Sequence, residues 1–300
     1  MSSFLRFLTD AGNSMGSVVK RLLKQEQSKT AVRETPSSST QVAAAPAKED
    51  SGQEILLPPM EVRIPVRSDE EFIRMGNLFL RYFRDLAGLR PDETVLDVGC
   101  GAGRIARPLM GFLSDKAEYW ALDINRNMIQ WCIDNISARR PNFHFEVSDI
   151  FNSRYNQGGK FKPGEFIFPY PDDKFDFVFL TSVFTHMLPD DVDHYFSELA
   201  RVVKPGGRTF ITYFLLNEES RACIAAGKSK PTFGFKLDDR DDCLISKPNT
   251  PEGSIAYDET FVMELYRKHG FEVRQPLYYG SWCGREGGKD NQDIVVASRI

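Results

Sequence analysis

The residues with the clearest chemical pattern lie at positions 95–104, where the sequence reads VLDVGCGAGR. A short apolar run leads into glycines at every second position, Gly99, Gly101 and Gly103, and a segment with helical spacing follows. Glycine is needed where the backbone turns sharply and a ligand must approach it without meeting a Cβ atom. The pattern therefore indicates a strand, a ligand-binding loop and a helix, an arrangement that holds nucleotide-containing cofactors.

Two related nucleotide-binding loops have a different spacing. A P-loop closes with Lys-Ser or Lys-Thr, and neither pair follows the glycines here. A dinucleotide-binding loop of the form GxGxxG, counted from Gly99, needs a third glycine where this chain has Arg104. The spacing is instead Asp97-x-Gly99-x-Gly101-x-Gly103, which excludes the P-loop and counts against a nicotinamide cofactor.

These residues must be positioned by alternating strands and helices, which the chain predicts from about residue 59. Apolar runs predict strands at 94–98, 119–122, 143–147, 175–180, 208–214, 271–279 and 293–298. Amphipathic spacing predicts helices at 70–86, 104–113, 128–133, 190–203 and 259–269. This alternation is typical of a mainly parallel sheet covered by helices on both faces. Right-handed crossovers place the carboxyl ends of the parallel strands on one edge, where ligands bind.

Further motifs follow the glycine-rich loop in order. Asp123 ends the second strand, SDI (148–150) follows the third, and FDFVFLTSVFTHM (175–187) covers the fourth strand and its turn. The turn KPGG (204–207) precedes the fifth strand. Together these motifs resemble those of class I S-adenosylmethionine (SAM)-dependent methyltransferases across residues 70–300. The resemblance implies a Rossmann-like α/β fold with a seven-stranded, mostly parallel sheet, an antiparallel last strand, SAM as the cofactor and methyltransferase activity.

The resemblance also implies which residues bind the cofactor. Asp123 would accept hydrogen bonds from the ribose hydroxyls, and Asp149 from the adenine amino group. Asp97 would contact the methionine amino group, or only brace the loop, and Asp149 has the alternative of a local turn cap. The expected set is Asp97, Gly99, Cys100, Gly101, Gly103, Asp123, Ile124, Met128, Asp149, Ile150 and Thr181.

Methyl transfer from a sulfonium depends mainly on aligning donor and acceptor in a dry pocket. A hydroxyl acceptor must also lose its proton, and histidine is suited to removing it near neutral pH. His186 is the candidate catalytic base, because it lies just past the fourth strand on the edge where ligands bind. The alternative is that His186 only makes a local hydrogen bond at the start of the following helix.

Acceptor-binding side chains are expected above the same edge. The connection 152–174 is longer than a plain turn, and the insertion 215–258 after the fifth strand is predicted to form a lid. A third segment, 280–285, joins the last two strands, where an incidental tryptophan in a glycine-rich hairpin is the alternative interpretation. The candidates are Tyr155, Tyr213, Tyr257, Trp282 and Arg285.

The amino-acid composition limits the cellular compartments and the binding partners that the protein is expected to have. The chain has 300 residues and a net charge of −4. This charge argues against nucleic-acid binding through an extended basic surface. Its five cysteines include no C-x-x-C pair, so no zinc site or other metal is expected and a reducing compartment fits. No stretch approaches the roughly 20 apolar residues of a membrane-spanning helix. We therefore expect a cytoplasmic protein, with membrane association left open.

Residues 1–58 differ from the rest. Positions 4, 8, 11, 15, 18 and 22 are apolar and fall on one helical stripe, and residues 1–33 carry six basic against two acidic side chains. A basic amphipathic helix of this kind, at residues 4–24, docks on a membrane surface or a protein partner, although a frayed tail is the alternative. Residues 25–55 predict a disordered linker. The predicted methyltransferase domain then covers 59–300, with its lid at about 215–258.

Three functions remain after these exclusions. The leading hypothesis is a SAM-dependent methyltransferase that acts on a small-molecule, glycan or lipid-linked acceptor, at oxygen, with no nucleic acid as partner. The second is a catalytically silent SAM-binding scaffold or partner subunit. The third, a nicotinamide-dependent reductase, is opposed by Arg104. The sequence leaves the acceptor, the methylated atom and the oligomeric state open.

Overall fold

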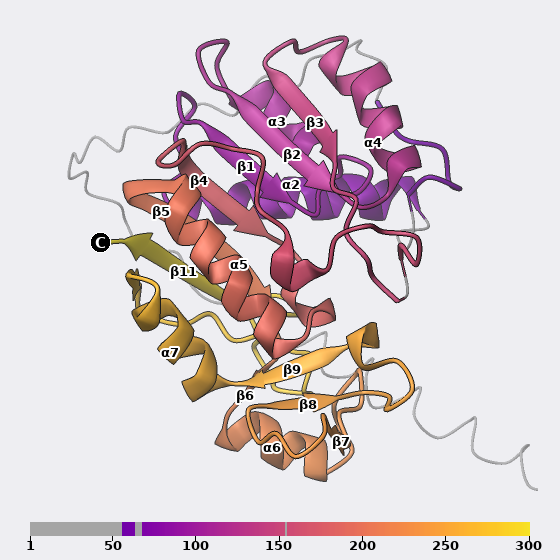
Figure 1. The fold of residues 1–300 in the computed structure, drawn as a ribbon, viewed down its shortest axis with the longest axis vertical. Helices are drawn as coiled ribbons and strands as arrows, with labels where there is room; N and C mark the ends of the chain where they lie inside the picture. The colour runs from indigo at the N-terminus through magenta and orange to yellow at the C-terminus, as the bar shows by residue number, and fades with distance from the viewer. Residues whose placement is uncertain (1–55, 64–67, 154) are drawn as a thin grey trace, which may run out of the picture. The chain divides into compact units, whose positions relative to one another are not determined.

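A seven-stranded sheet forms the centre of the fold (Figure 1). Its strands are β1 (Val95–Val98), β2 (Tyr119–Asp123), β3 (Phe143–Val147), β4 (Phe175–Leu180), β5 (Val203–Tyr213), β10 (Phe271–Val273) and β11 (Asp293–Arg299). They lie in the order β10-β11-β5-β4-β1-β2-β3. The pairs from β5 to β3 are parallel, whereas β11 is antiparallel to both of its neighbours. The predicted Rossmann-like sheet with an antiparallel last strand is therefore confirmed.

The structure is a computed structural model, and it describes residues 56–63, 68–153 and 155–300. These residues belong to one compact unit with bounds Glu54 and Ile300. The predicted amphipathic helix at residues 4–24 lies outside the described residues, and so do all but the last three residues of the segment 1–58. The predicted division of the chain at residue 58 therefore stays a prediction. None of the described helices is long and apolar enough to cross a membrane.

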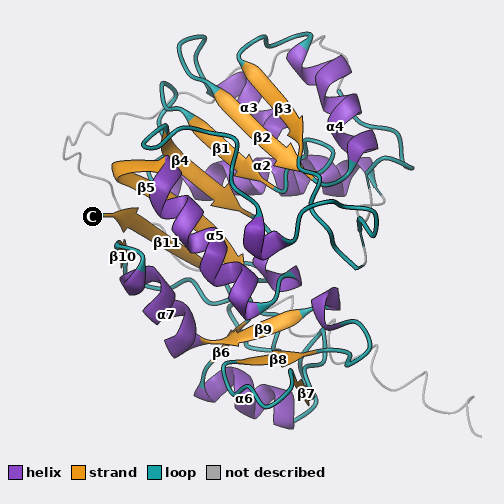
Figure 2. Cartoon of the chain, viewed as in Figure 1, coloured by secondary structure: helices purple, strands orange, loops and turns teal. Residues whose placement is uncertain are grey.

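Helices cover both faces of the sheet, and the alternation of side chains along each strand explains why (Figures 1 and 2). In β4, Phe177 and Phe179 join one buried cluster, while Val178 and Leu180 join another. The first cluster receives side chains from α2 (Asp69–Asp85), α3 (Ala106–Phe112) and α4 (Arg126–Cys132). The second receives side chains from α5 (Pro189–Val202) and α7 (Glu259–Lys268). Strands that are apolar on both faces thus need helices on both faces.

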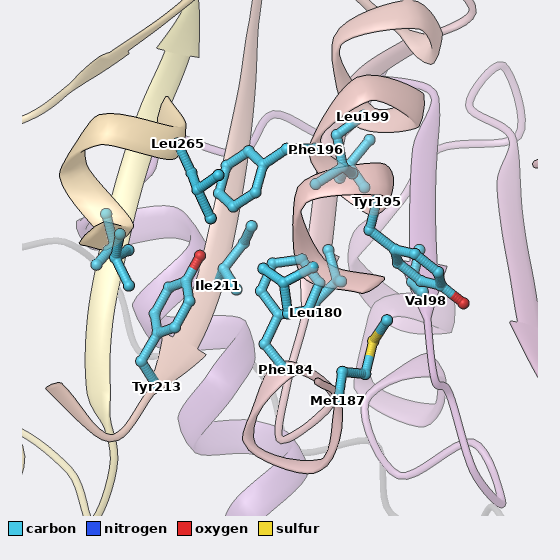
Figure 3. Close-up of a cluster of buried hydrophobic side chains, with 14 of the residues drawn as sticks. Val98, Leu180, Phe184, Met187, Tyr195, Phe196, Leu199, Ile211, Tyr213 and Leu265 are labelled. Carbon is cyan, nitrogen blue, oxygen red and sulfur yellow. The ribbon is translucent and has the colours of Figure 1, made fainter. Parts of the chain in front are cut away.

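The cluster beneath α5 also fixes the turn that follows β4. Figure 3 shows Phe184 of this turn among side chains from α5 and from the neighbouring strands. The Phe184 ring lies 5.7 Å from the Phe196 ring and 5.8 Å from the Tyr213 ring, centroid to centroid. Because Phe184 is fully buried, the residues that follow it are held at the carboxyl end of β4. The apolar core therefore positions the turn that contains His186.

The insertion after β5 has secondary structure of its own. Its elements are β6 (Leu215–Leu216), α6 (Glu218–Ala225), β7 (Phe235–Lys236), β8 (Cys243–Ile245) and β9 (Ile255–Asp258). The strands form a second sheet in the order β6-β9-β8-β7. The insertion is therefore a folded cap on the end of β5 rather than a plain loop, and its predicted role as a lid stays a prediction.

One predicted strand is shorter than expected. The apolar pattern predicts a strand at 271–279, but β10 ends at Val273, and Tyr278 makes only an isolated bridge with Ile294. Pro276 interrupts the run, and proline has no N–H to donate to a neighbouring strand. The chain from 274 to 292 is therefore a long connection that returns toward the carboxyl ends of the parallel strands before β11 begins.

Gly76 allows α2 to approach the glycine-rich loop. A Cβ atom at this position would lie 2.3 Å from the backbone oxygen of Arg104, whereas one at Gly111, in α3, would meet nothing within 4 Å. We expect Gly76→Ala to lower the free energy of unfolding by about 1–3 kcal/mol through overpacking. The matched change Gly111→Ala should raise it by up to about 1 kcal/mol. Urea unfolding measures both, and equal effects of the two changes would contradict the close contact.

Candidate cofactor and acceptor site

A pocket of about 460 Å³ opens at the carboxyl ends of the central parallel strands. The glycine-rich loop after β1, the ends of β2 and β3, and the turn after β4 form one part of its wall. The rest of the wall includes the segment 151–163, Pro231 and Ser254 of the insertion, and Gln292. Nine of the predicted cofactor residues line it: Asp97, Gly99, Cys100, Gly101, Asp123, Ile124, Met128, Ile150 and Thr181. The structure therefore brings most of the predicted cofactor set together.

Asp123 holds the glycine-rich loop in place. Its Oδ2 accepts a hydrogen bond from the Gly101 N–H at 2.8 Å, and its Oδ1 accepts one from the Asn125 N–H at 2.8 Å. Gly99 has φ +83°, and a Cβ atom there would lie 2.5 Å from Cγ2 of Val183 in the turn after β4. Only glycine fits this conformation and this close approach. The loop is thus fixed on one side by a carboxylate and on the other by packing.

Asp97 is a buried carboxyl group with one unused oxygen. It is 1% exposed, and its Oδ2 accepts a hydrogen bond from the Tyr119 hydroxyl at 2.6 Å. Its Oδ1 has no hydrogen-bond partner within the described part of the chain. Burial raises the pKa of Asp97 to about 8, an effect that the Tyr119 hydrogen bond opposes. An unpaired oxygen on a pocket wall is suited to a cationic ligand group.

Arg104 faces the same pocket with the opposite charge. Its guanidinium makes no hydrogen bond or ion pair with any residue that the structure describes, and burial lowers its pKa. The charge of Asp97 acts on Arg104 in the opposite direction and raises its pKa. The sequence pattern around Arg104 excludes a dinucleotide-binding loop but does not predict that this side chain lies on the pocket wall.

Two predicted cofactor residues do not line the pocket. Gly103 has φ +73°, and a Cβ atom there would lie 2.6 Å from Cδ1 of Ile136, so this glycine serves the packing of the loop. Asp149 instead lies 3.5 Å from the Lys160 ammonium and 3.7 Å from the Arg126 guanidinium. Asp149 thus lies outside the pocket wall, and its predicted contact with adenine stays a prediction. The neighbouring residue Ser148, which the motif does not single out, lines the pocket instead.

His186 and Tyr155 both line the pocket, as predicted. His186 Nδ1 lies 3.0 Å from the backbone oxygen of Glu252 in the insertion. A carbonyl oxygen only accepts, so Nδ1 carries the hydrogen and the lone pair of the neutral ring is on Nε2. The Tyr155 ring meets the imidazole edge to face, with centroids 5.8 Å apart. The structure thus supports a defined tautomer for His186, while its catalytic role stays a prediction.

Two of the predicted acceptor contacts, Tyr213 and Tyr257, lie in the core rather than on the pocket wall. Both side chains are fully buried and do not line the pocket. The Tyr213 hydroxyl pairs with the Tyr266 hydroxyl at 3.0 Å. The Tyr257 hydroxyl donates to the backbone oxygen of Phe184 at 2.9 Å, which helps to fix the turn after β4. These tyrosines belong to the core beneath the site because their ends of β5 and β9 are covered by α5, α7 and the insertion.

Two further predicted acceptor contacts, Trp282 and Arg285, also lie away from the pocket wall. Trp282 is 2% exposed, and its Nε1–H donates to Oδ2 of Asp293 at 2.7 Å. The Arg285 side chain is 8% exposed and donates to Glu219 at 2.6 Å and to Asp293 at 3.4 Å. Neither residue lines the pocket. Both side chains connect the segment before β11 to the insertion. The sequence alone could not distinguish this structural role from a role in ligand binding.

A polar group on the pocket wall was not predicted from the sequence. Gln292 Oε1 accepts hydrogen bonds from Thr212 Oγ1 at 2.6 Å and from Ser182 Oγ at 3.1 Å. Ser182 has φ 60°, a conformation that costs energy for a residue other than glycine and that clusters at functional sites. Gln292 and Ser182 are 110 residues apart in the chain, so no local motif predicts their contact.

Similar proteins support the cofactor assignment. Residues 96–211 match a family model described as a methyltransferase domain. The phosphoethanolamine N-methyltransferase 3 of Arabidopsis thaliana is 26% identical over 144 residues, which are 48% of this chain and 26% of that protein. The ubiquinone/menaquinone biosynthesis C-methyltransferase of Vibrio vulnificus is 27% identical over 137 residues, 46% of this chain and 47% of that protein. A tRNA N(3)-cytidine methyltransferase of Gallus gallus is 26% identical over 172 residues, 53% and 44% of the two chains.

The matched parts span between about a quarter and just under half of the length of these relatives. Among solved structures, the PH0226 protein of Pyrococcus horikoshii shares the fold, with a TM-score of 0.50, 17% identity, and coverage of 77% of this chain and 92% of that one. Residues 96–211 are therefore similar to a methyltransferase domain, and the fold and the motifs fit the class I SAM-dependent methyltransferases. SAM is the cofactor of this class, and a nicotinamide cofactor is not supported.

Proposed function

We propose that this protein is an active SAM-dependent methyltransferase that methylates an oxygen atom of a small-molecule, glycan or lipid-linked acceptor. The observation that carries this proposal is that one pocket joins the glycine-rich loop to side chains that the cofactor motifs do not include. The additional wall is largely apolar, with Phe151, Tyr155, Pro163, Phe214 and Pro231. A scaffold protein that binds SAM but does not transfer its methyl group has no need for this additional apolar wall beside the cofactor-binding residues.

The pocket has groups that fit SAM. Both oxygens of Asp123 already accept one backbone N–H each, and each retains a lone pair for a ribose hydroxyl. Asp97 Oδ1 and Ser148 Oγ are buried polar atoms without a partner among the described residues, and a bound ligand would satisfy them. Gly99 and Gly101, both at positive φ, leave the backbone open to close approach. When bound, SAM supplies an electrophilic methyl group.

Binding of SAM is expected to depend on pH through Asp97. With its pKa raised to about 8, the carboxyl is mostly protonated near neutral pH when no ligand is bound. The methionine ammonium of SAM, placed beside Oδ1, would favour the ionised form and lower the pKa. Binding then releases a proton below about pH 8. The affinity should therefore rise with pH across this range, by up to about tenfold per pH unit.

Calorimetry in buffers with different ionisation enthalpies measures this proton release. For the wild type near neutral pH, the observed binding heat should change with the buffer. Asp97→Asn keeps the shape of the side chain but cannot ionise, so its binding heat should be the same in every buffer. A wild-type heat that does not depend on the buffer would show that Asp97 does not meet the cation.

His186 is the residue that we propose as the general base. The Glu252 carbonyl fixes the hydrogen on Nδ1, so Nε2 is the nitrogen that takes the proton from an acceptor hydroxyl. The apolar wall around the acceptor excludes water that would compete for the methyl group. The acidic net charge of the chain gives no support to a tRNA acceptor, although one relative is named for that substrate.

The test incubates the full chain with methyl-labelled SAM and, separately, with a lipid extract, a polar metabolite extract and tRNA. Label should enter one of the first two fractions as a methyl ether or ester. His186→Gln should lower that rate on the order of 10²–10⁴-fold while SAM affinity stays unchanged. Label on nitrogen, on carbon or in tRNA would overturn the oxygen assignment. No transfer to any fraction, with SAM binding intact, would favour the scaffold.

A further inference from the structure

Exposed apolar side chains are concentrated in the segment 151–167, part of which lines the pocket. Eight large apolar residues are exposed in the described part of the chain, and four of them lie within residues 151–167. They are Phe151 (39% exposed), Tyr155 (48%), Phe161 (50%) and Ile167 (68%), and we call them the apolar rim. Phe151 and Tyr155 also line the pocket, so the rim begins at its wall. Clustered exposed apolar residues of this kind mark interaction sites.

The backbone holds the rim in a defined conformation. The Phe151 N–H donates to the Phe161 carbonyl at 2.8 Å, and the Phe161 N–H donates to the Asp149 carbonyl at 3.0 Å. Asn152 and Asn156 exchange two backbone hydrogen bonds of 3.0 Å within the same segment. A Cβ atom at Gly159 would lie 2.3 Å from the backbone of Ile150, so the two arms of the segment are in close contact. Phe151, Tyr155 and Phe161 thus belong to a folded, hairpin-like loop.

Positive charges flank the aromatic residue at the centre of the rim. Lys160 and Lys162, on either side of Phe161, have side chains that are 78% and 76% exposed. Their ammonium groups lie 3.5 Å from Asp149 and 3.6 Å from Glu165. Ion pairs this exposed are worth little, so both lysines can exchange these partners for other anions. Aromatic side chains next to lysines are the combination that binds the interface of an anionic bilayer.

We infer that the apolar rim docks on the surface of an anionic lipid bilayer, with the mouth of the pocket facing the lipid. This inference deepens the proposed function, on which it rests for the acceptor: docking would let a lipid-linked acceptor pass from the bilayer into the pocket. The bilayer is the occupant that the charge pattern favours, because exposed lysines complement anionic headgroups. A bilayer also fits the position of the rim. Whatever binds beside the pocket must leave the acceptor a path into the pocket, and a lipid-linked acceptor would enter from the bilayer itself.

Vesicle sedimentation tests the docking separately from catalysis. The full chain is mixed with vesicles of phosphatidylcholine alone, or of phosphatidylcholine with phosphatidylserine. The wild type should bind the second kind more strongly, and Phe161→Ser should weaken that binding about tenfold, the loss expected when one large apolar side chain no longer inserts. The matched control is Phe235→Ser, because Phe235 is 48% exposed but lies on β7. Lys160→Glu should weaken binding to the anionic vesicles only.

Phe161 does not line the pocket, so SAM titration of the same variants should give wild-type affinity. Equal vesicle binding by the wild type and Phe161→Ser, or equal losses in Phe161→Ser and Phe235→Ser, would overturn the docking. Light scattering that shows a dimer lost in Phe161→Ser would overturn it in favour of a second copy of the chain. Failure to bind SAM would remove the proposed function but leave the vesicle result to stand.

Discussion

Replacing Asp123 with alanine is expected to weaken the binding of both SAM and S-adenosylhomocysteine by more than tenfold. The change removes the acceptor of the Gly101 N–H, which holds the glycine-rich loop, and the carboxylate proposed to accept the ribose hydroxyls. Losing hydrogen bonds to a charged acceptor costs about 1.5–3 kcal/mol, which corresponds to this change in affinity. Isothermal calorimetry measures it, and both ligands should be affected alike because both carry the ribose.

The control for this experiment is Asp115→Ala, because the Asp115 side chain is 98% exposed and does not line the pocket. It should leave both affinities unchanged. Asp123→Asn should give an intermediate loss, since an amide oxygen still accepts from one of the two N–H donors. If Asp123→Ala binds SAM as tightly as the wild type while its thermal unfolding is unaltered, the assignment of this edge to the cofactor is wrong.

The largest effect on stability is expected at Asp293. This carboxyl group is 1% exposed and accepts hydrogen bonds of 2.7 Å from the Leu215 N–H, the Gly280 N–H and the Trp282 Nε1–H. It also lies 3.4 Å from the Arg285 guanidinium. The side chain thus joins the start of the insertion, the connection before β11 and β11 itself. Asp293→Asn would turn an amide NH₂ toward buried donors and should lower the free energy of unfolding by about 3 kcal/mol.

Urea unfolding measures this change, and Trp282→Phe is its internal standard. The phenylalanine variant removes one of the donors to Asp293 but leaves the carboxyl group, so we expect a loss of about 1–1.5 kcal/mol. A smaller loss for Asp293→Asn than for Trp282→Phe would show that Asp293 does not connect these segments. Because Phe214, next to Leu215, lines the pocket, the Asn variant should also lower methyl transfer.

The central sheet and the cofactor loop were predictable because their signals are local. The predicted strands at 143–147 and 175–180 agree with β3 and β4 at both ends, and α5 is shifted by only one residue. Apolar alternation and glycine spacing are read within a few consecutive residues, and the edge on which ligands bind follows from the handedness of the crossovers. The same reasoning placed Asp123 correctly, because it directly ends a parallel strand.

The residues on the acceptor-binding part of the pocket could not be predicted from such local signals. Tryptophan and arginine often contact ligands, but Trp282 and Arg285 instead contact the buried carboxyl group of Asp293. The strands of the insertion are two to four residues long and carry no periodic pattern. The contact of Gln292 with Ser182 joins positions 110 residues apart. Burial and partner choice at such positions depend on the whole fold, which one sequence does not reveal.

The most direct test of the cofactor assignment is to titrate SAM, S-adenosylhomocysteine and NADH separately into the purified full chain by calorimetry. SAM and S-adenosylhomocysteine should bind at one site, and NADH should not bind. Binding of NADH, or of none of the three, would contradict the assignment of the glycine-rich loop and of Asp123 to SAM.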